Sequence, residues 1–385
     1  MKIWYLIIAL FLISINLRPA ITSVAPLLDT IQQDLGMSGT TAGLLTTLPV
    51  LCMGIFAPLA TKISERVGLE RGIFYALVLI TIATALRGFF GTVPLLIVTA
   101  FLAGVGIGVA GPLVSGFIKQ YFPTKPGVVG VYTVSMAIGA GSATGISAPI
   151  YESLGNWEPA LAIWAVLGLA AMVIWIRFPG KKQSGLPEKT ALPWTSGRAW
   201  LILLFFGLMS SIFYSVTAWG APIIQSMGYN SVIAGSMLTA FVLIQIPSSF
   251  IIPSLVARFG YVFPTLIGCT VIELTGVILL IAGGQPLVAM LLIGLGAGGL
   301  FPLALMLPII ETDSYQKASA WAAMSQGGGY IISALGPLGV GAVYDLTGSY
   351  LNALYGMTAI ICMMGVLQVM LWVTADRTSL KKRRV

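Results

Sequence analysis

The stretch IWYLIIALFLISINLRPAITSVAPLLDTIQQDLG, residues 3–36, begins with an apolar run and then places Asn16, Arg18 and Pro19 in the same helix-length segment. Because a helix rises about 1.5 Å per residue, Arg18 lies roughly 22 Å along the axis from Ile3. That is at or past the middle of a hydrocarbon core about 30 Å thick. An arginine at this depth costs at least ~2.5–3.5 kcal/mol, so we expect the other helices to build a polar cavity around it.

The composition indicates a polytopic membrane protein. The chain has 385 residues, of which 57% are hydrophobic and 8% are charged, and its mean hydropathy is +0.97. No soluble domain of this size combines these values. The net charge of +8 comes from basic residues in short loops and in the tail, so it indicates membrane topology, and we expect no nucleic-acid partner.

The chain lacks histidine, and its three cysteines, Cys52, Cys269 and Cys362, lie far apart in apolar runs. They fit packing positions and form neither a disulfide framework nor a metal-ligand spacing. Histidine is the commonest metal ligand and the commonest acid–base group at neutral pH. We therefore expect no catalytic residues, no metal, no cofactor and no enzyme activity.

Apolar runs predict an all-helical chain with twelve membrane spans. The spans cover residues 4–33, 40–64, 71–90, 94–120, 127–152, 157–178, 199–225, 230–258, 261–283, 286–311, 316–344 and 350–374. The first run has no small-residue cleavage site, so we interpret it as a retained span and not as a signal peptide.

Basic residues set the expected orientation. If the N-terminus is cytoplasmic, 18 of the 20 Lys and Arg residues fall in cytoplasmic segments, and the other two, Arg18 and Arg87, fall within spans. The positive-inside rule therefore predicts a multi-pass protein of the inner (plasma) membrane with both termini in the cytoplasm.

The two halves of the chain repeat. Leu35-Gly36-Met37 matches Met227-Gly228-Tyr229 at an offset of 192 residues, and GVGIGVAGP in the fourth span recurs as GLGAGGLFP in the tenth. A polar linker separates the halves. We therefore expect an N-terminal six-helix bundle (1–178), a cytoplasmic linker (179–198) and a C-terminal six-helix bundle with a short basic tail (199–385).

Several motifs carry a family resemblance. They are NLRPAITSVAPLLDTI in span 1, GLLTTLP in span 2, GVGIG followed by FIKQYFP in span 4, AWGAP in span 7, GLGAGGLFPL in span 10 and MSQGGGYIISALGP in span 11. With the six-plus-six duplication, they make the chain resemble the major facilitator superfamily, and within it the CynX/NimT branch of putative cyanate and nitroimidazole transporters. The resemblance implies two pseudo-symmetric bundles that rock about a mid-membrane site lined by spans 1, 4, 7 and 10, with help from 5, 8 and 11.

The loop between spans 2 and 3 is a degenerate form of the superfamily's loop motif. In residues 61–71, TKISERVGLER, Glu65 stands where the family has aspartate, and Leu69-Glu70 replaces two basic residues. The resemblance implies a gating role for Glu65 and Arg66.

Arg18 is the main candidate for substrate binding, because a guanidinium group stays charged and offers a planar fork of donors. The alternatives are a structural ion pair and a packing residue bonded to backbone carbonyls. Asn16, Thr22 and Ser23 lie on nearby faces and are candidates to line the same cavity. For the two short hydroxyl side chains, bonding to the helix backbone is the alternative.

Four polar-tipped side chains in central spans are further substrate-binding candidates: Tyr214, Trp219, Gln326 and Tyr330. Such groups stack on a flat substrate or hydrogen-bond to it. Generic packing between helices is the alternative for each of them.

Three charged side chains are candidates for coupling or gating. Glu273 is the lone carboxylate deep in span 9. Burial favours its protonated form, which suits proton coupling; the alternative is a protonated or hydrogen-bonded packing residue. Arg87, near the outer end of span 3, either guides anions at an outer gate or extends to the membrane interface. Lys119 either holds an inner gate or acts as a positive-inside anchor.

Glycine clusters sit inside apolar helices, so they predict close helix approach and not a phosphate-binding loop. The pairs with the small-x-x-x-small spacing are Gly104 with Gly108, Gly141 with Gly145, and Gly294 with Gly298.

The sequence predicts a secondary active transporter that moves a small anion or a compact polar or heterocyclic solute by rocker-switch alternating access. We expect proton coupling, a functional monomer and no partner beyond the solute and the lipid bilayer. A proton-coupled multidrug or toxic-compound exporter is the alternative within transport. An integral membrane enzyme is disfavoured because no span holds a carboxylate pair or a metal-ligand cluster.

Overall fold

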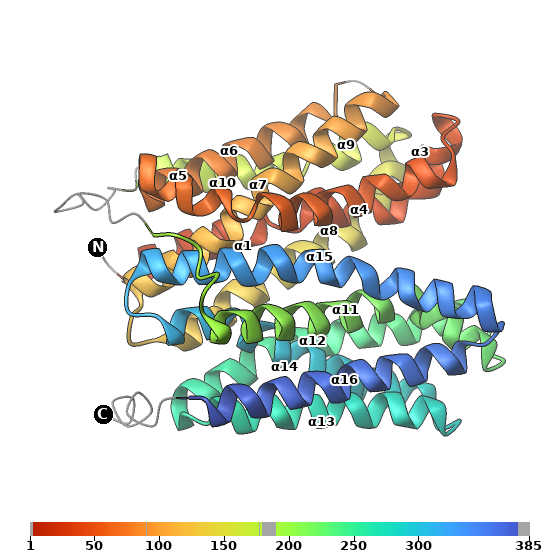
Figure 1. Cartoon of the computed structure of the whole chain (residues 1–385). Coiled ribbons are helices and arrows are strands. Elements are labelled where there is room, and N and C mark those ends of the chain that lie inside the picture. Colours follow the sequence, from red (N-terminus) through yellow and green to blue (C-terminus); the bar gives the residue numbers. More distant parts are fainter. Residues whose placement is uncertain (1–2, 90, 177, 179–189, 376–385) are drawn as a thin grey trace. The chain divides into compact units, whose positions relative to one another are not determined.

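The computed structural model describes residues 3–89, 91–176, 178 and 190–375. Most of the predicted linker and the basic tail lie outside these residues. Every regular element in the described part of the chain is a helix (Figure 1). The prediction of an all-helical chain is confirmed.

The first half of the chain is divided into more helical elements than the second. The elements of the first half are α1 Ile3–Ile15, α2 Pro19–Thr22, η1 Ala25–Leu27, α3 Leu28–Asp34, α4 Gly39–Phe56, α5 Leu59–Val67, α6 Leu69–Leu86, α7 Val93–Tyr121, η2 Pro126–Val128, α8 Val129–Leu154, α9 Trp157–Ala162 and α10 Ala165–Ile176. Those of the second half are α11 Gly197–Ser226, α12 Ser231–Phe259, α13 Val262–Ile281, α14 Pro286–Glu311, α15 Tyr315–Thr347 and α16 Tyr350–Val373.

The described residues contain 11 helical stretches long and apolar enough to cross a membrane, or 12 if the bent pair α4 and α5 is one span. The two helices of this pair meet at 61°. Pro58 lies at the bend, where its ring lacks an amide hydrogen and clashes with the carbonyl one turn back. The predicted twelve spans are found when this bent pair is counted as one span.

Contacts between Cα atoms divide the chain into two compact units. Unit 1 comprises Met1–Thr124, Val131–Pro193 and Ile309–Gly327, and unit 2 comprises Lys125–Gly130, Trp194–Pro308 and Gly328–Val385. Unit 1 thus includes the end of α14 and the first part of α15. The division into two bundles and a linker, which rests on the sequence repeat, stays a prediction.

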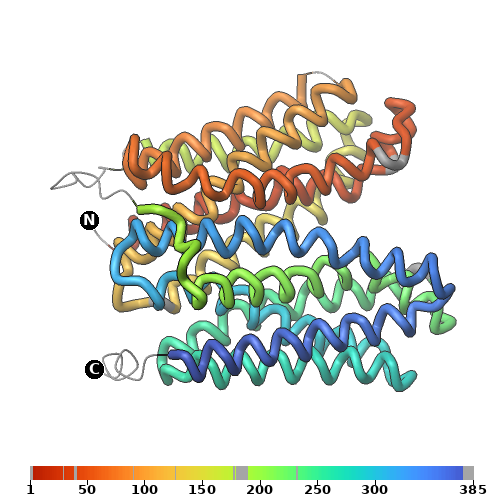
Figure 2. The backbone as a smooth tube through the Cα atoms, in the orientation of Figure 1, coloured from red at the N-terminus to blue at the C-terminus, as the bar shows by residue number. Residues whose placement is uncertain are grey.

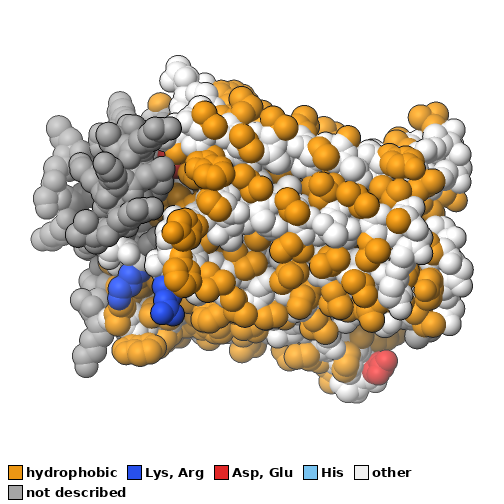
Figure 3. All heavy atoms as spheres, turned by 90° about the horizontal axis from the view of Figure 1, so that it is seen from below, with side chains coloured by type: hydrophobic (Ala, Val, Ile, Leu, Met, Phe, Trp, Pro, Cys, Tyr) orange, Lys and Arg blue, Asp and Glu red, His pale blue; other side chains and the backbone are white. Residues whose placement is uncertain are grey.

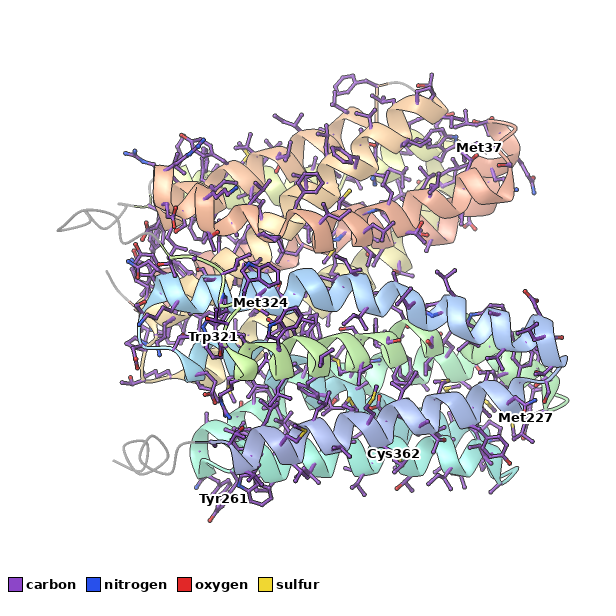
Figure 4. All side chains as sticks on the ribbon, in the orientation of Figure 1. Met37, Met227, Tyr261, Trp321, Met324 and Cys362 are labelled. Atoms are coloured by element: carbon purple, nitrogen blue, oxygen red, sulfur yellow. The ribbon has the colours of Figure 1, made fainter. Side chains whose placement is uncertain are left out.

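Each unit has helices that pack along its length. In unit 1, α4 and α6 both pack along α7, and α10 lies against α6 and α1. In unit 2, α16 packs along both α11 and α13 (Figure 2). Met227, after α11, and Tyr261, before α13, lie at opposite ends of unit 2 (Figure 4), because α12 runs between them.

Glycines of α7 bring its two neighbours close. A Cβ on Gly104 would lie 2.6 Å from the Cα of Pro49 in α4. A Cβ on Gly106 would lie 2.7 Å from the Cγ1 of Ile80 in α6. Alternate glycines therefore serve two different helices, as expected for small residues at membrane helix contacts.

The glycines of α14 repeat this arrangement. A Cβ on Gly294 would lie 2.5 Å from the carbonyl oxygen of Phe241 in α12, and one on Gly296 would lie 2.6 Å from that of Cys269 in α13. The packing interpretation is confirmed for these glycines, and the duplication read from the sequence reappears in the contacts.

The pair Gly141 and Gly145 in α8 is a correction. A Cβ on either glycine would have no heavy atom within 4 Å, so this pair makes no close helix contact. The contact is made instead by Gly139, whose Cβ would clash with the carbonyl oxygen of Ile15 in α1. Residues two apart point to different sides of a helix, so Gly139 and Gly141 cannot share one contact face.

The surface shown in Figure 3 has the pattern of a lipid-facing protein. Hydrophobic and uncharged atoms cover its middle, and the charged side chains that are visible lie near its ends. This distribution keeps charge out of the membrane core.

Candidate functional site

A break in the first span places Arg18. Helix α1 ends at Ile15, α2 begins at Pro19, and turn residues 16–18 lie between them. Pro19 lacks the amide hydrogen that would bond to the Ile15 carbonyl. The backbone of Arg18 has φ −119° and ψ −38°, and its side chain is partly exposed. The guanidinium therefore projects from an interrupted helix and not from a continuous one.

Three polar side chains of unit 1 come together near Gly111 of α7. Arg18 interacts electrostatically with Tyr132 of α8. A Cβ on Gly111 would lie 2.5 Å from Oε1 of Gln326 and 3.8 Å from the hydroxyl of Tyr132. A glycine at this point lets the amide of α15 and the phenol of α8 approach the backbone of α7.

Gln326 brings an unused donor to this group. Its Nε2 is buried and has no hydrogen-bond partner, and the residue is 4% exposed. Figure 4 marks this part of α15 by Trp321 and Met324. A buried donor without a partner costs free energy, so its presence suits a site that pairs it with an acceptor on a ligand.

Together these side chains offer one fixed positive charge, a hydroxyl and an amide N–H. A guanidinium binds carboxylate-like and other anionic groups through charge-assisted hydrogen bonds. The arrangement suits an anion, or a compact solute with several acceptor atoms.

Tyr132 is a site residue that sequence reasoning missed. It is 2% exposed and lies in the predicted fifth span, one of those that the family resemblance names as helping to line the cavity. The available signal was a tyrosine in VGVYTVSMAIG, but nothing in the sequence links that position to Arg18.

Asn16 and Thr22 bond to the backbone around the break. Asn16 donates from Nδ2 to the carbonyls of Leu12 (2.6 Å) and of Leu167 in α10 (3.2 Å). Thr22 donates from Oγ1 to the Arg18 carbonyl at 3.2 Å. The Thr22 contact matches the backbone-bonding alternative, and the role of both residues in substrate binding stays a prediction.

Arg87 also serves the first span, and the expectation that it extends to the membrane interface is wrong. It is 1% exposed; it donates from Nε to Thr99 Oγ1 at 3.1 Å and from Nη1 to the Ala20 carbonyl at 2.6 Å. Near the end of α2, the Val24 amide turns back to the Ile21 carbonyl, so it does not serve Ala20. A buried carbonyl in a membrane requires a hydrogen-bond donor. Because no backbone amide of the irregular segment reaches the Ala20 carbonyl, Arg87 supplies that donor.

The aromatic candidates lie in unit 2 and contact packing partners. Trp219 donates from Nε1 to the Pro337 carbonyl at 2.9 Å. Tyr330, 4% exposed, meets Phe206 edge-on with ring centroids 5.3 Å apart. Tyr214 is partly buried in α11. The binding role of these three residues stays a prediction.

The candidate gating residues of unit 1 make contacts at the ends of helices. Glu65 accepts from the Thr190 amide at 2.8 Å, whereas Arg66 is exposed. Lys119 donates from Nζ to the Ile309 carbonyl at 2.9 Å, which ties the end of α7 to the end of α14. The gating roles of these residues, and of Arg87, stay predictions.

Glu70 is a second residue whose role sequence reasoning missed. Its Oε1 accepts from Gln120 Nε2 at 3.0 Å and from the Tyr121 hydroxyl at 2.6 Å. The carboxylate that replaces a basic residue of the family motif therefore joins the start of α6 to the end of α7, within the FIKQYFP motif.

Glu273 lies in α13 of unit 2. It is 0% exposed, and neither carboxylate oxygen has a hydrogen-bond partner. It packs against Gly296 of α14, whose Cβ would lie 2.7 Å from its own. Glu273 thus lies in a buried helix contact, and its coupling role stays a prediction.

The chain belongs to the Major Facilitator Superfamily, whose family model matches residues 6–334. It is thus a multi-pass membrane protein of a transporter family. This confirms the resemblance on which the fold prediction rested.

Three relatives span almost the whole chain. An uncharacterized transporter of Bacillus subtilis, YycB, is 36% identical over 94% of this chain and 92% of its own. The cyanate transport protein CynX of Escherichia coli is 30% identical over 90% and 91%. The 2-nitroimidazole transporter of Escherichia coli is 29% identical over 94% and 93%.

Solved structures share the fold. The fucose:proton symporter FucP of Escherichia coli has a TM-score of 0.78 at 15% identity, covering 96% of this chain and 98% of its own. The proton:xylose symporter XylE has a TM-score of 0.78 at 14% identity, covering 97% and 96%. At these identities the likeness concerns the fold alone.

Proposed function

We propose that the protein is a secondary active transporter of a small anion or a compact polar or heterocyclic solute, held by Arg18, Tyr132 and Gln326. The observation that carries the proposal is the meeting of a guanidinium, a phenol and an unpaired amide N–H near Gly111. The names of the relatives, a cyanate transport protein and a 2-nitroimidazole transporter, fit this chemistry. We infer a proton gradient as the energy source and alternating access as the mechanism.

The three residues have separable roles in this proposal. Arg18 supplies the charge that attracts an anion or a strong dipole, and its fork fixes the orientation of planar acceptors. Tyr132 and Gln326 each add one hydrogen-bond donor. Because the binding groups are short of acceptors, a solute rich in acceptor atoms is favoured over a cation.

The test is uptake by proteoliposomes of labelled cyanate and, separately, of 2-nitroimidazole. Arg18→Ala is expected to abolish uptake. Arg18→Lys keeps the charge but loses the fork, so its apparent affinity is expected to fall by about tenfold to a hundredfold, the equivalent of a hydrogen bond to a charged group. Gln326→Leu and Tyr132→Phe are expected to raise KM with little change in the maximal rate.

Arg71→Ala is the matched control, because Arg71 is an exposed arginine of the same unit and has no proposed role in binding or gating. It is expected to transport as the wild type does. If the wild type takes up either solute and Arg18→Ala takes it up equally well, the proposed site is contradicted. A wild type that moves neither solute contradicts the proposed solute class.

A further inference from the structure

Glu273 is a buried acid that no hydrogen bond stabilises. Both oxygens lack a hydrogen-bond partner and the residue is 0% exposed. Burying an acid in this way is unfavourable, and burying its charged form is far more so. An ionisable residue that is this costly to bury inside a membrane protein is expected to have a function.

Within the part of the chain that the structure describes, no counter-charge is found beside Glu273. Helix α14 presents Gly296 to it, and the titratable neighbour on α13 is Cys269, which interacts with it electrostatically. One turn away on α13, Thr270 bonds to Gln368 of α16 at 3.0 and 2.7 Å. That pair is neutral and satisfies itself. No ion pair involves Glu273 among the described residues.

The duplicated half shows that the architecture does not need an acid here. In unit 1, Gly106 of α7 packs against Ala76 and Ile80 of α6. In unit 2, Gly296 of α14 packs in the same way against Cys269 and Glu273 of α13. Glu273 is therefore the counterpart of Ile80, and an isoleucine fills this contact without any polar atom.

We propose that Glu273 is a proton-binding site enclosed in the contact between α13 and α14, and that its protonation sets whether these helices can touch. The neutral acid permits the contact at Gly296. When the carboxyl group releases its proton to water, the contact holds an uncompensated charge and must open to hydrate it. The proton site itself does not depend on the proposed function. Only its role in transport, which is to couple proton movement to α14, rests on that function.

The first experiment needs no substrate. The apparent melting temperature of the purified protein in detergent is measured between about pH 5 and pH 8. The folded state holds the acid neutral and the unfolded chain ionises it in water, so raising the pH is expected to lower the melting temperature of the wild type. Glu273→Gln and Glu273→Ile remove this part of the pH dependence.

Glu273→Ile also copies the residue of the other half. It is expected to melt at or above the wild-type temperature, because it replaces an unpaired acid with a side chain that this contact accepts elsewhere in the same molecule. Glu152→Gln is the control, since Glu152 is an exposed glutamate, and it is expected to keep the wild-type pH dependence. A pH dependence that Glu273→Gln leaves unchanged overturns the proposal.

The second experiment uses proteoliposomes and whichever of cyanate and 2-nitroimidazole the wild type moves. Glu273→Gln is expected to exchange labelled for unlabelled solute across the membrane but to lose accumulation driven by an imposed pH gradient. Accumulation equal to that of the wild type overturns the coupling role. If the wild type moves neither solute, the proposed function fails while the melting experiment still decides the proton site.

Discussion

At the scale of single residues, the buried cation Arg87 explains how an irregular first span survives inside a membrane protein. Its guanidinium bonds to a carbonyl of α2 and to a hydroxyl of α7. These bonds hold the short helix that begins directly after Arg18. Arg87 therefore supports the proposed site from outside it, by fixing the backbone that carries Arg18.

Arg87→Met is expected to destabilise the protein by about 1–3 kcal/mol, because the Ala20 carbonyl is left buried without a donor. The same change is expected to speed amide hydrogen exchange in residues 16–27. Arg87→Lys keeps a charged donor and should restore much of both. Thermal unfolding in detergent and exchange followed by mass spectrometry measure the two effects, with the exposed Arg66→Met as the control. Exchange that stays at the wild-type level in Arg87→Met contradicts this role.

At the scale of elements, how closely two helices of a unit approach each other depends on which glycines lie in their contact. Gly139 and Gly141 are both in α8, two residues apart, yet only Gly139 meets a neighbour, the carbonyl of Ile15. The contact brings α8, which also carries Tyr132, against the end of α1.

Gly139→Ala is expected to cost about 1–3 kcal/mol, the usual range for overpacking, and to weaken solute binding because α1 and α8 must separate. In Gly141→Ala the added Cβ has no heavy atom within 4 Å. This variant is expected to leave the melting temperature unchanged or slightly raised, since alanine favours the helix. The two melting temperatures and the KM values are compared side by side. Equal behaviour of the two variants would show that α8 does not approach α1 through Gly139.

At the scale of the whole molecule, the distribution of basic residues predicts the orientation in the membrane. The expected topology has both termini in the cytoplasm. A fluorescent protein fused to the C-terminus should therefore fluoresce, and alkaline phosphatase fused there should be inactive. The opposite result would reverse the orientation. A fusion within the segment between α15 and α16 should give the reverse pattern, which serves as the internal control.

The sequence by itself determined the class of the molecule and much of its outline. Hydropathy, span length and the positive charge of loops are local properties, so they predicted an all-helical membrane chain with twelve spans, and they marked Arg18 as unusual. The motifs identified the superfamily. The glycines of α7 and α14 were assigned to packing correctly, because their spacing and apolar surroundings are visible along the chain.

Tertiary structure alone decided which side chains meet. Tyr132 and Gln326 are 194 residues apart in number, and neither carries a mark that joins it to Arg18. The carbonyl partner of Arg87 exists only because the chain breaks near Pro19, and a donor from another helix reaches it. Hydrogen bonds and burial depend on neighbours that are distant in sequence, whereas helices and spans depend on residues a few positions away.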